Sequence, residues 1–386
     1  MSVLAGHYDP AFKEIAEIFE ESFAAGRERG AALAVTVDGR LVVDVWGGTR
    51  DEEQSQPWER NTVVNVFSAT KAVAALCAHH LAERGLLDLN APVVTYWPEF
   101  GAAGKEEVTV SQLLDHSAGL PALREPLPPG TLFNWTAMTD ALAAEEPWWE
   151  PGTRHGYHVV TFGFLVGEVL RRADGRSVRD LVRDEIAAPL GIDLFIGLPE
   201  RLSEQAAYLP PTEPPTAAQM EAPAARALMD PTSMAARAFT NPADLVEPGL
   251  VNTQRWRQAD IPASNGHANA RALATMYGVL AAGGTVEGVH LLQQTVDTLA
   301  RERVSGVDAV LFAPTRFSLG FMLPNELRPY SPGDRVFGHP GAGGALGFCD
   351  LDARMAFGYT PNRTVTTLHG ADPRWTPLTT ALYGCL

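Results

Sequence analysis

The chain has 386 residues, 46% of them hydrophobic, which is enough to bury one large core or two closely packed domains. Its formal net charge of −16 argues against nucleic acid and anionic membrane surfaces as partners, and no apolar run is long enough to cross a membrane. Three widely spaced cysteines, Cys77, Cys349 and Cys385, form neither a disulfide framework nor a zinc site. Together with residues 1–8, which lack a signal-peptide pattern, they predict a cytoplasmic protein.

The predicted elements begin with strands, continue with helices and end with strands. Residues 9–29 have the pattern of an amphipathic helix, and residues 31–46 that of a hairpin around Asp38-Gly39. Residues 62–67 are expected to be extended and to lead into a helix that ends near Arg84-Gly85. The later segments with helical or strand periodicity are, in order, helices at 111–114, 161–172 and 268–284, strands at 336–339, 345–350 and 355–360, and a final helix from 376.

This order of elements predicts an α+β fold. Strands far apart in sequence are expected to share one antiparallel sheet, which helices flank, beside a mostly helical region. The predicted division is discontinuous, with residues 1–67 and 305–386 in the sheet region and residues 68–304 in the helical region. Within the latter, residues 199–250 carry nine prolines and are either a poorly ordered insertion or a flap over the site.

The pair Ser68 and Lys71 is the first candidate for chemistry. Lys71 is one of only three lysines against 27 arginines, and a lysine, unlike an arginine, can be desolvated into a neutral base. A spacing of three residues places both side chains on one face of a helix. The expected helix N-terminus favours anionic oxygen and disfavours a protonated amine. The alternative is a serine that only caps the helix, followed by an exposed lysine.

Five segments together form an ordered set of motifs. They are Ser68-Ala69-Thr70-Lys71, residues 113–120 (LLDHSAGL), residues 151–158 (PGTRHGYH), residues 265–271 (NGHANAR) and residues 338–344 (GHPGAGG). The set resembles the SxxK enzymes of the serine β-lactamase and penicillin-binding-protein superfamily, and most closely the family VIII carboxylesterases of its class C-like branch. The resemblance extends over nearly the whole chain and implies a class C β-lactamase-like fold.

The resemblance implies a catalytic centre that uses no metal and no organic cofactor. Ser68 would be the nucleophile that accepts the acyl group. Lys71 and Tyr157 would be its candidate bases, and which of them takes the proton in each step is left open. The backbone N–H groups of Ser68 and Ala342 would form the oxyanion hole.

The substrate-binding residues implied by the resemblance are His339 and Gly341, and here the sequence departs from β-lactamases. His339-Pro340-Gly341 stands in place of KTG, so the lysine that holds a β-lactam carboxylate is missing. Tyr157-His158-Val159 stands in place of YxN, so an amide contact is missing as well. Both losses favour a small neutral ester as the substrate.

The predicted function is therefore that of a carboxylesterase, a serine hydrolase that cleaves short-chain carboxylic esters. A β-lactamase, a D-Ala-D-Ala peptidase and an acyltransferase are the alternatives among enzymes. A binding protein that keeps the fold without catalysis is the alternative from another class. The sequence leaves open whether the chain forms a homo-oligomer.

Three other patterns in the sequence could indicate functional residues. Ser117 lies in a near match to GxSxG that lacks the first glycine, so we do not expect it to be a nucleophile. His155 and His158 have HxxH spacing without an upstream carboxylate, which favours hydrogen-bonded structural histidines over metal ligands. Trp148 and Trp149 either line an acyl pocket or pack in the core.

Overall fold

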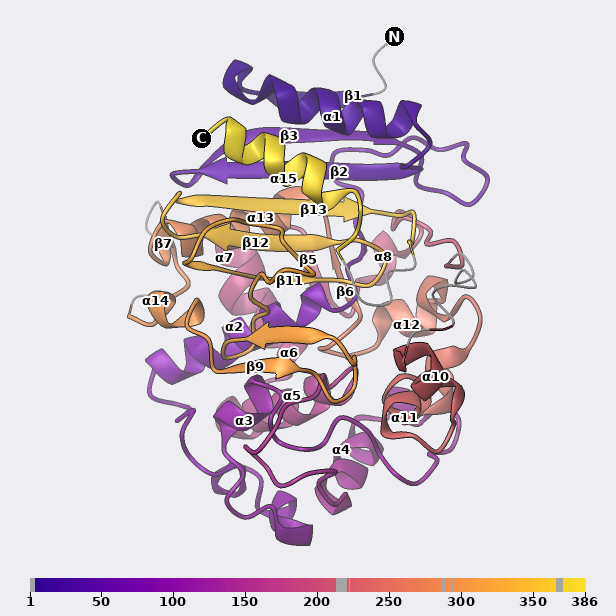
Figure 1. Cartoon of the computed structure of the whole chain (residues 1–386), viewed down its shortest axis with the longest axis vertical. Helices are drawn as coiled ribbons and strands as arrows, with labels where there is room; N and C mark the ends of the chain where they lie inside the picture. Colours follow the sequence, from indigo (N-terminus) through magenta and orange to yellow (C-terminus); the bar gives the residue numbers. More distant parts are fainter. Residues whose placement is uncertain (1–3, 213–220, 222, 287–288, 293, 366–370) are drawn as a thin grey trace.

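The fold is built around one antiparallel sheet. The structure is a computed structural model and describes residues 4–212, 221, 223–286, 289–292, 294–365 and 371–386. Six strands form the sheet in the order β1-β3-β2-β13-β12-β11. They are β1 (Leu4–Tyr8), β2 (Gly30–Val37), β3 (Arg40–Gly48), β11 (Val336–Pro340), β12 (Leu346–Asp350) and β13 (Met355–Pro361). The two ends of the chain thus meet where β2 pairs with β13, which confirms the predicted α+β fold (Figure 1).

Helices cover both faces of this sheet. Helices α1 (Lys13–Ala24) and α15 (Trp375–Gly384) pack on the face that carries large side chains such as Phe357. Helix α13 (Ala270–Ala281) packs on the other face, where the strand residues are small. A Cβ at Gly358 would lie only 2.1 Å from the carbonyl oxygen of Ala270, so the close approach of α13 depends on that glycine.

The helical region surrounds α2 (Ala69–Glu83). This helix is buried on nearly every side, because α5 (Thr161–Asp174) and strand β11 pack against it. The other helices are α3 (Val110–Leu114), α4 (Trp135–Ala144), α6 (Val178–Leu181), the π-helical segment η5 (Val182–Ala187), α7 (Ala188–Leu190), α8 (Glu200–Ser203), α10 (Pro223–Met229), α11 (Met234–Thr240), α12 (Gln254–Gln258) and α14 (Val296–Leu299). Short 3-10 turns connect them at η1 (Pro10–Phe12), η2 (Val93–Thr95), η3 (Pro98–Gly104), η4 (Thr131–Phe133), η6 (Ala243–Val246) and η7 (Leu250–Asn252).

Smaller strand groups hold the segments that approach α2. A three-stranded group has the order β4-β6-β5, and two hairpins lie outside it. These strands are β4 (Val64–Asn65), β5 (Leu194–Ile196), β6 (Gly266–Ala268), β7 (Thr285–Val286), β8 (Val289–His290), β9 (Val304–Val307) and β10 (Pro314–Phe317). Strand β4 leads directly into Ser68, and the β9–β10 hairpin lies beside Tyr157.

Most predicted elements occur where the periodicity indicates. The Asp38-Gly39 hairpin is present, and both turn residues have positive φ, as a two-residue turn requires. The helix predicted at 9–29 is shorter, since Pro10 opens a 3-10 turn and Gly26 has a φ of +66°. The division of the chain at residues 67/68 and 304/305 stays a prediction. Within the described part of the chain, every helix is too short or too polar to span a membrane.

Candidate active site

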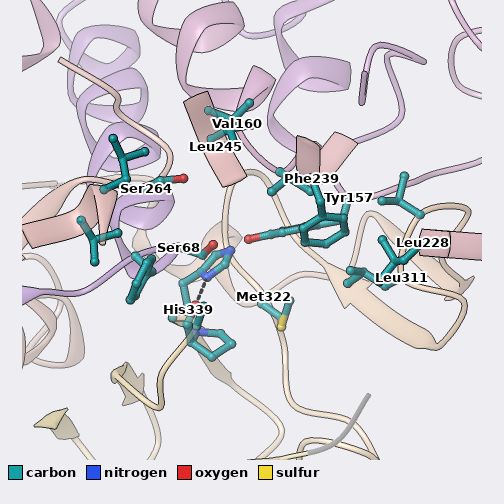
Figure 2. Close-up of a pocket in the computed structure, with 18 of the residues that line it drawn as sticks. Ser68, Tyr157, Val160, Leu228, Phe239, Leu245, Ser264, Leu311, Met322 and His339 are labelled. Atoms are coloured by element: carbon teal, nitrogen blue, oxygen red, sulfur yellow. Dashed lines mark hydrogen bonds between the residues drawn. The ribbon is translucent and has the colours of Figure 1, made fainter. Parts of the chain in front are cut away.

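Ser68 occupies the N-cap position of α2, after a strained turn. Phe67 has a φ of +45°, a left-handed conformation that is costly for a bulky residue and that its surroundings must enforce. The Val66 N–H donates to the carbonyl of Gly266 at 2.8 Å, and the Gly266 N–H donates to Thr70 Oγ1 at 2.8 Å. Strand β6 thus holds both sides of the turn. The Ser68 side chain lines a cavity of about 580 Å³ (Figure 2).

Lys71 is fully buried beside Ser68, with its amine in contact with the serine hydroxyl. Its Nζ lies 3.3 Å from Ser68 Oγ, 2.7 Å from the carbonyl oxygen of Val159 and 3.0 Å from that of Ala263. Burial lowers the pKa of Lys71 well below its ordinary value of 10.5. A neutral amine has two N–H groups for the two carbonyls and a lone pair for the serine hydroxyl, whereas the protonated amine donates to all three oxygens. The site therefore holds the amine in either protonation state.

A second buried lysine, Lys105, can be compared with Lys71. Lys105 is also buried, and its Nζ donates to the carbonyl oxygens of Ala102 at 2.7 Å and Ala143 at 3.0 Å. A buried lysine held by carbonyls is thus no sign of chemistry by itself, and the serine hydroxyl beside Lys71 makes the difference. The alternative of a capping serine with an exposed lysine is wrong, because Ser68 makes no side-chain cap and Lys71 is not exposed.

Tyr157 is the third member of this group. Figure 2 shows its hydroxyl pointing toward Ser68, with which it forms a hydrogen bond. Its ring centroid lies 4.7 Å from Lys71 Nζ and stacks on Phe317 at 6.1 Å. Burial raises the pKa of Tyr157, while the hydrogen bond to Ser68 and the positive charge of Arg328 act in the opposite direction.

An aspartate that the sequence analysis did not select holds Tyr157 in place. Asp308 is fully buried, and its Oδ1 accepts hydrogen bonds from the backbone N–H groups of Tyr157 at 3.0 Å, Val310 at 2.8 Å and Leu311 at 2.9 Å. The carboxylate therefore joins the loop of the β9–β10 hairpin to the loop that carries Tyr157. No motif in the sequence distinguishes this aspartate from the other acidic residues.

The histidines behind Tyr157 are structural. His158 donates from Nδ1 to the carbonyl of Gly156 at 2.7 Å, and its Nε2 accepts from the Leu120 N–H at 3.0 Å. Its own backbone N–H donates to Nδ1 of His116 at 3.1 Å. Burial lowers the pKa of His158 to about 3, so the ring is neutral. Within the described residues, no group of three or more histidine, cysteine or acidic side chains is placed to hold a metal ion.

The end of β11 brings a second backbone segment up to Ser68. A Cβ on Gly341 would lie 2.1 Å from the carbonyl oxygen of Val66, so this approach requires glycine. Ala342 follows and lines the cavity with Ser68. Among the hydrogen bonds of the described residues, the N–H groups of Ser68 and Ala342 donate to no protein acceptor. The structure thus brings together two backbone N–H groups that are free to bind another oxygen.

His339 extends into the same cavity (Figure 2). Its Nδ1 lies 2.7 Å from the carbonyl oxygen of Pro340, and because a carbonyl only accepts, Nδ1 carries the proton. Burial lowers the pKa of His339 to about 3, so the ring is neutral and Nε2 is an acceptor. Nε2 is buried and has no hydrogen-bond partner within the described part of the chain. The imidazole therefore offers an unused acceptor near Ser68 and Tyr157.

The cavity walls are mainly apolar and come from distant parts of the chain. The apolar lining residues include Val159, Val160, Leu228, Phe239, Leu245, Leu250, Val251, Val310, Leu311 and Met322. Several of them belong to residues 199–250, so the described part of this proline-rich stretch forms a wall of the cavity. The flap interpretation therefore fits, although residues 213–220 and 222 lie outside the described residues.

The two tryptophans before the Tyr157 loop do not line this cavity. Trp148 Nε1 donates to the carbonyl of Ala122 at 2.8 Å, and Trp149 Nε1 donates to that of Ser117 at 3.2 Å. They support the loops beneath the site, so the core-packing alternative is correct.

The chain is similar to one known protein family and to several known proteins over most of its length. The family described as Beta-lactamase matches residues 15–379. Esterase/beta-lactamase LipL of Mycobacterium tuberculosis (strain H37Rv) is 37% identical over 376 residues, which cover 94% of this chain and 84% of that protein. Among solved structures, a family VIII carboxylesterase is 37% identical with a TM-score of 0.89 and covers 99% of this chain and 100% of its own. A penicillin-binding-protein homologue from Caulobacter crescentus is 35% identical with a TM-score of 0.86 and the same coverage.

Proposed function

Since the chain belongs to the beta-lactamase family, we propose that it is a carboxylesterase that hydrolyses short-chain esters through an acyl-Ser68 intermediate. The observation that carries this proposal is the contact of Ser68 Oγ with the buried Lys71 amine at 3.3 Å, beside Tyr157 in one cavity. The printed names of two relatives, an esterase/beta-lactamase and a family VIII carboxylesterase, support an ester as the substrate.

In the acylation step, Ser68 Oγ attacks the ester carbonyl carbon and its proton passes to the neutral amine of Lys71. When the two N–H groups of the neutral amine donate to the carbonyls of Val159 and Ala263, its lone pair is left for the hydroxyl 3.3 Å away. The carbonyl oxygen becomes negative and binds to the N–H groups of Ser68 and Ala342. The tetrahedral intermediate then expels the alkoxide, which takes the Tyr157 proton and leaves as the alcohol.

In the deacylation step, a water molecule replaces the alcohol. The Tyr157 phenolate takes a proton from this water, whose oxygen attacks the acyl carbon. Lys71 returns its proton to Ser68 Oγ as the carboxylic acid departs. Ester and water are thus converted into acid and alcohol, and each side chain regains its starting protonation state. This assignment gives Lys71 and Tyr157 separate roles, which the sequence left open.

His339 and Gly341 are proposed to bind the substrate. The neutral His339 can accept a hydrogen bond but brings no positive charge to a carboxylate, which fits a neutral ester better than a β-lactam. Gly341 keeps the Ala342 N–H close to Ser68. The three free cysteines support the proposal of a reducing, cytoplasmic location.

The test compares hydrolysis of p-nitrophenyl butyrate with that of a chromogenic cephalosporin, using wild type and Ser68→Ala. We expect ester turnover that disappears in the variant and little cephalosporin turnover. Dominant cephalosporin turnover would show a β-lactamase instead. An acceptor alcohol that captures most of the acyl group would show an acyltransferase. Ester turnover that survives in Ser68→Ala would show a different nucleophile.

A further inference from the structure

Arg328 places a buried guanidinium in the wall of the catalytic cavity. It lies between β10 and β11, in a turn where its backbone N–H donates to Asn325 Oδ1 at 2.9 Å. Its side chain is only 8% exposed and lines the cavity together with Ser68 and Tyr157. Its position lies outside all five motifs.

This guanidinium differs from the other buried arginine of the sheet region. Arg374 is paired with Glu28 at 3.2 Å and with Asp372 at 2.6 Å. Arg328 has no carboxylate in an ion pair within the described residues, and its guanidinium makes one long hydrogen bond, from Nη1 to the carbonyl of Pro314 at 3.5 Å. A buried charge without a partner is costly, so an anion that forms beside it during the reaction is stabilised.

The charges around Tyr157 identify that anion. Of the groups that contact its ring, His116 and His339 are neutral because burial lowers the pKa of each, and burial also lowers the pKa of Lys71 well below its ordinary value. Asp308 is negative and acts against ionisation of the phenol, while Arg328 acts in its favour. The effect is mutual: burial lowers the pKa of Arg328, and a charged Tyr157 acts in the opposite direction. Arg328 is thus the permanent positive charge on this side of the cavity.

On these grounds we infer that Arg328 stabilises the Tyr157 phenolate of the acyl-enzyme and supplies a positive charge to a cavity in which the neutral His339 stands in place of the KTG lysine. The inference rests on the proposed function. Tyr157 gives its proton to the leaving alkoxide and becomes an anion, which persists until a water molecule supplies the next proton. Over that interval the protonated Lys71 and Arg328 both offset the negative charge. Arg328 therefore acts on both the formation and the pH dependence of the intermediate without exchanging a proton.

The experiment follows the deacylation rate of wild type, Arg328→Gln and Arg328→Lys between pH 5 and about pH 9. Acyl-enzyme is formed with p-nitrophenyl butyrate and its decay is read by mass spectrometry. The phenolate must stay deprotonated to act as the base, so the deacylation rate falls at low pH; this fall is the acid limb of the pH profile. Loss of the Arg328 charge should move the acid limb to higher pH. One pH unit corresponds to about a tenfold slower decay at a pH below the limb. Arg328→Lys should keep the limb within a few tenths of a unit.

A matched control is Arg316→Gln. Arg316 lies on β10 of the adjacent hairpin, is half-exposed and pairs with Glu302, and its Nη1 donates to the carbonyl of Pro324. It does not line the cavity, so its loss should leave the limb unmoved. Labelling of Ser68 by a fluorophosphonate in every variant checks that the nucleophile and the fold are intact. This labelling separates the inference from the proposed function, because absence of labelling in wild type would count against the proposed function and not against the role of Arg328.

Two results would overturn the inference. One is an acid limb in Arg328→Gln that coincides with that of wild type while Ser68 still labels. The other is a loss confined to esters that carry a carboxylate, with neutral esters unaffected, which would make Arg328 a substrate-binding residue. A shift that occurs in Arg328→Gln, is absent in Arg316→Gln and is reversed in Arg328→Lys supports the inference.

Discussion

The substitution Gly341→Ala tests how the site forms its oxyanion hole. The added Cβ would lie 2.1 Å from the carbonyl oxygen of Val66, whereas ordinary contact begins at 3.4 Å. The end of β11 and the segment before Ser68 must therefore separate by about 1.3 Å. That separation moves the Ala342 N–H out of hydrogen-bonding distance from an oxygen that the Ser68 N–H still holds.

The expected loss follows from the removal of one oxyanion donor, which lowers kcat by about 100-fold to 1000-fold. The clash itself should lower the free energy of unfolding by about 1–3 kcal/mol, as other overpacked sites do. The assay measures kcat and KM for p-nitrophenyl butyrate beside thermal unfolding. KM should change little, because the donor acts on charge that forms in the transition state.

Gly384→Ala is the matched control. A Cβ at Gly384, the last residue of α15, meets no atom within 4 Å, so both activity and stability should be unchanged. A folded Gly341→Ala enzyme that keeps kcat within about threefold of wild type would refute the proposed role of this backbone segment, since the loss of one donor is expected to cost far more.

The remaining predictions concern the side chains around Ser68. Lys71→Arg and Lys71→Met should both lose the ester hydrolysis rate, because a guanidinium keeps its charge and cannot act as a base, whereas Lys105→Met should lose stability and keep kcat. The lowered pKa of Lys71 predicts that kcat/KM is constant through neutral pH and falls only in acid, where the amine becomes protonated; a base with the ordinary value of 10.5 would instead give a rate that still rises above pH 8. Tyr157→Phe should lower kcat more than it changes KM, and a pure KM effect would show that Tyr157 only positions the ester. Asp308→Ala should free the Tyr157 loop, with lower kcat and lower stability in the same variant, since three backbone N–H groups lose their acceptor.

The sequence alone predicted the antiparallel sheet and brought Ser68 and Lys71 together, because both follow from local periodicity. Alternating and helical patterns identify strands and helices, and a spacing of three residues on a helix fixes a contact. The Asp38-Gly39 turn was equally readable, since its residues tolerate positive φ.

Asp308 and Arg328 could not be found in this way. Each is one charged residue among many, and each acts on Tyr157 only because the β9–β10 hairpin and the segment between β10 and β11 fold against a loop more than 150 residues earlier in the chain. The sequence also could not show that Nε2 of His339 is a free acceptor. That depends on Nδ1 holding the proton, which it donates to the carbonyl of Pro340 beside it. When the role of a side chain depends on contacts with distant residues or on a histidine tautomer, no spacing in the sequence identifies it.

The most direct test of the account is identification of the acylated residue. Wild type and Ser68→Ala are mixed with p-nitrophenyl butyrate, quenched in acid within the first turnover, digested, and mapped by mass spectrometry. We expect one butyryl group on the peptide that contains Ser68 in wild type and none in the variant. A butyryl group on another residue such as Ser117, or hydrolysis by Ser68→Ala at the wild-type rate, would contradict it.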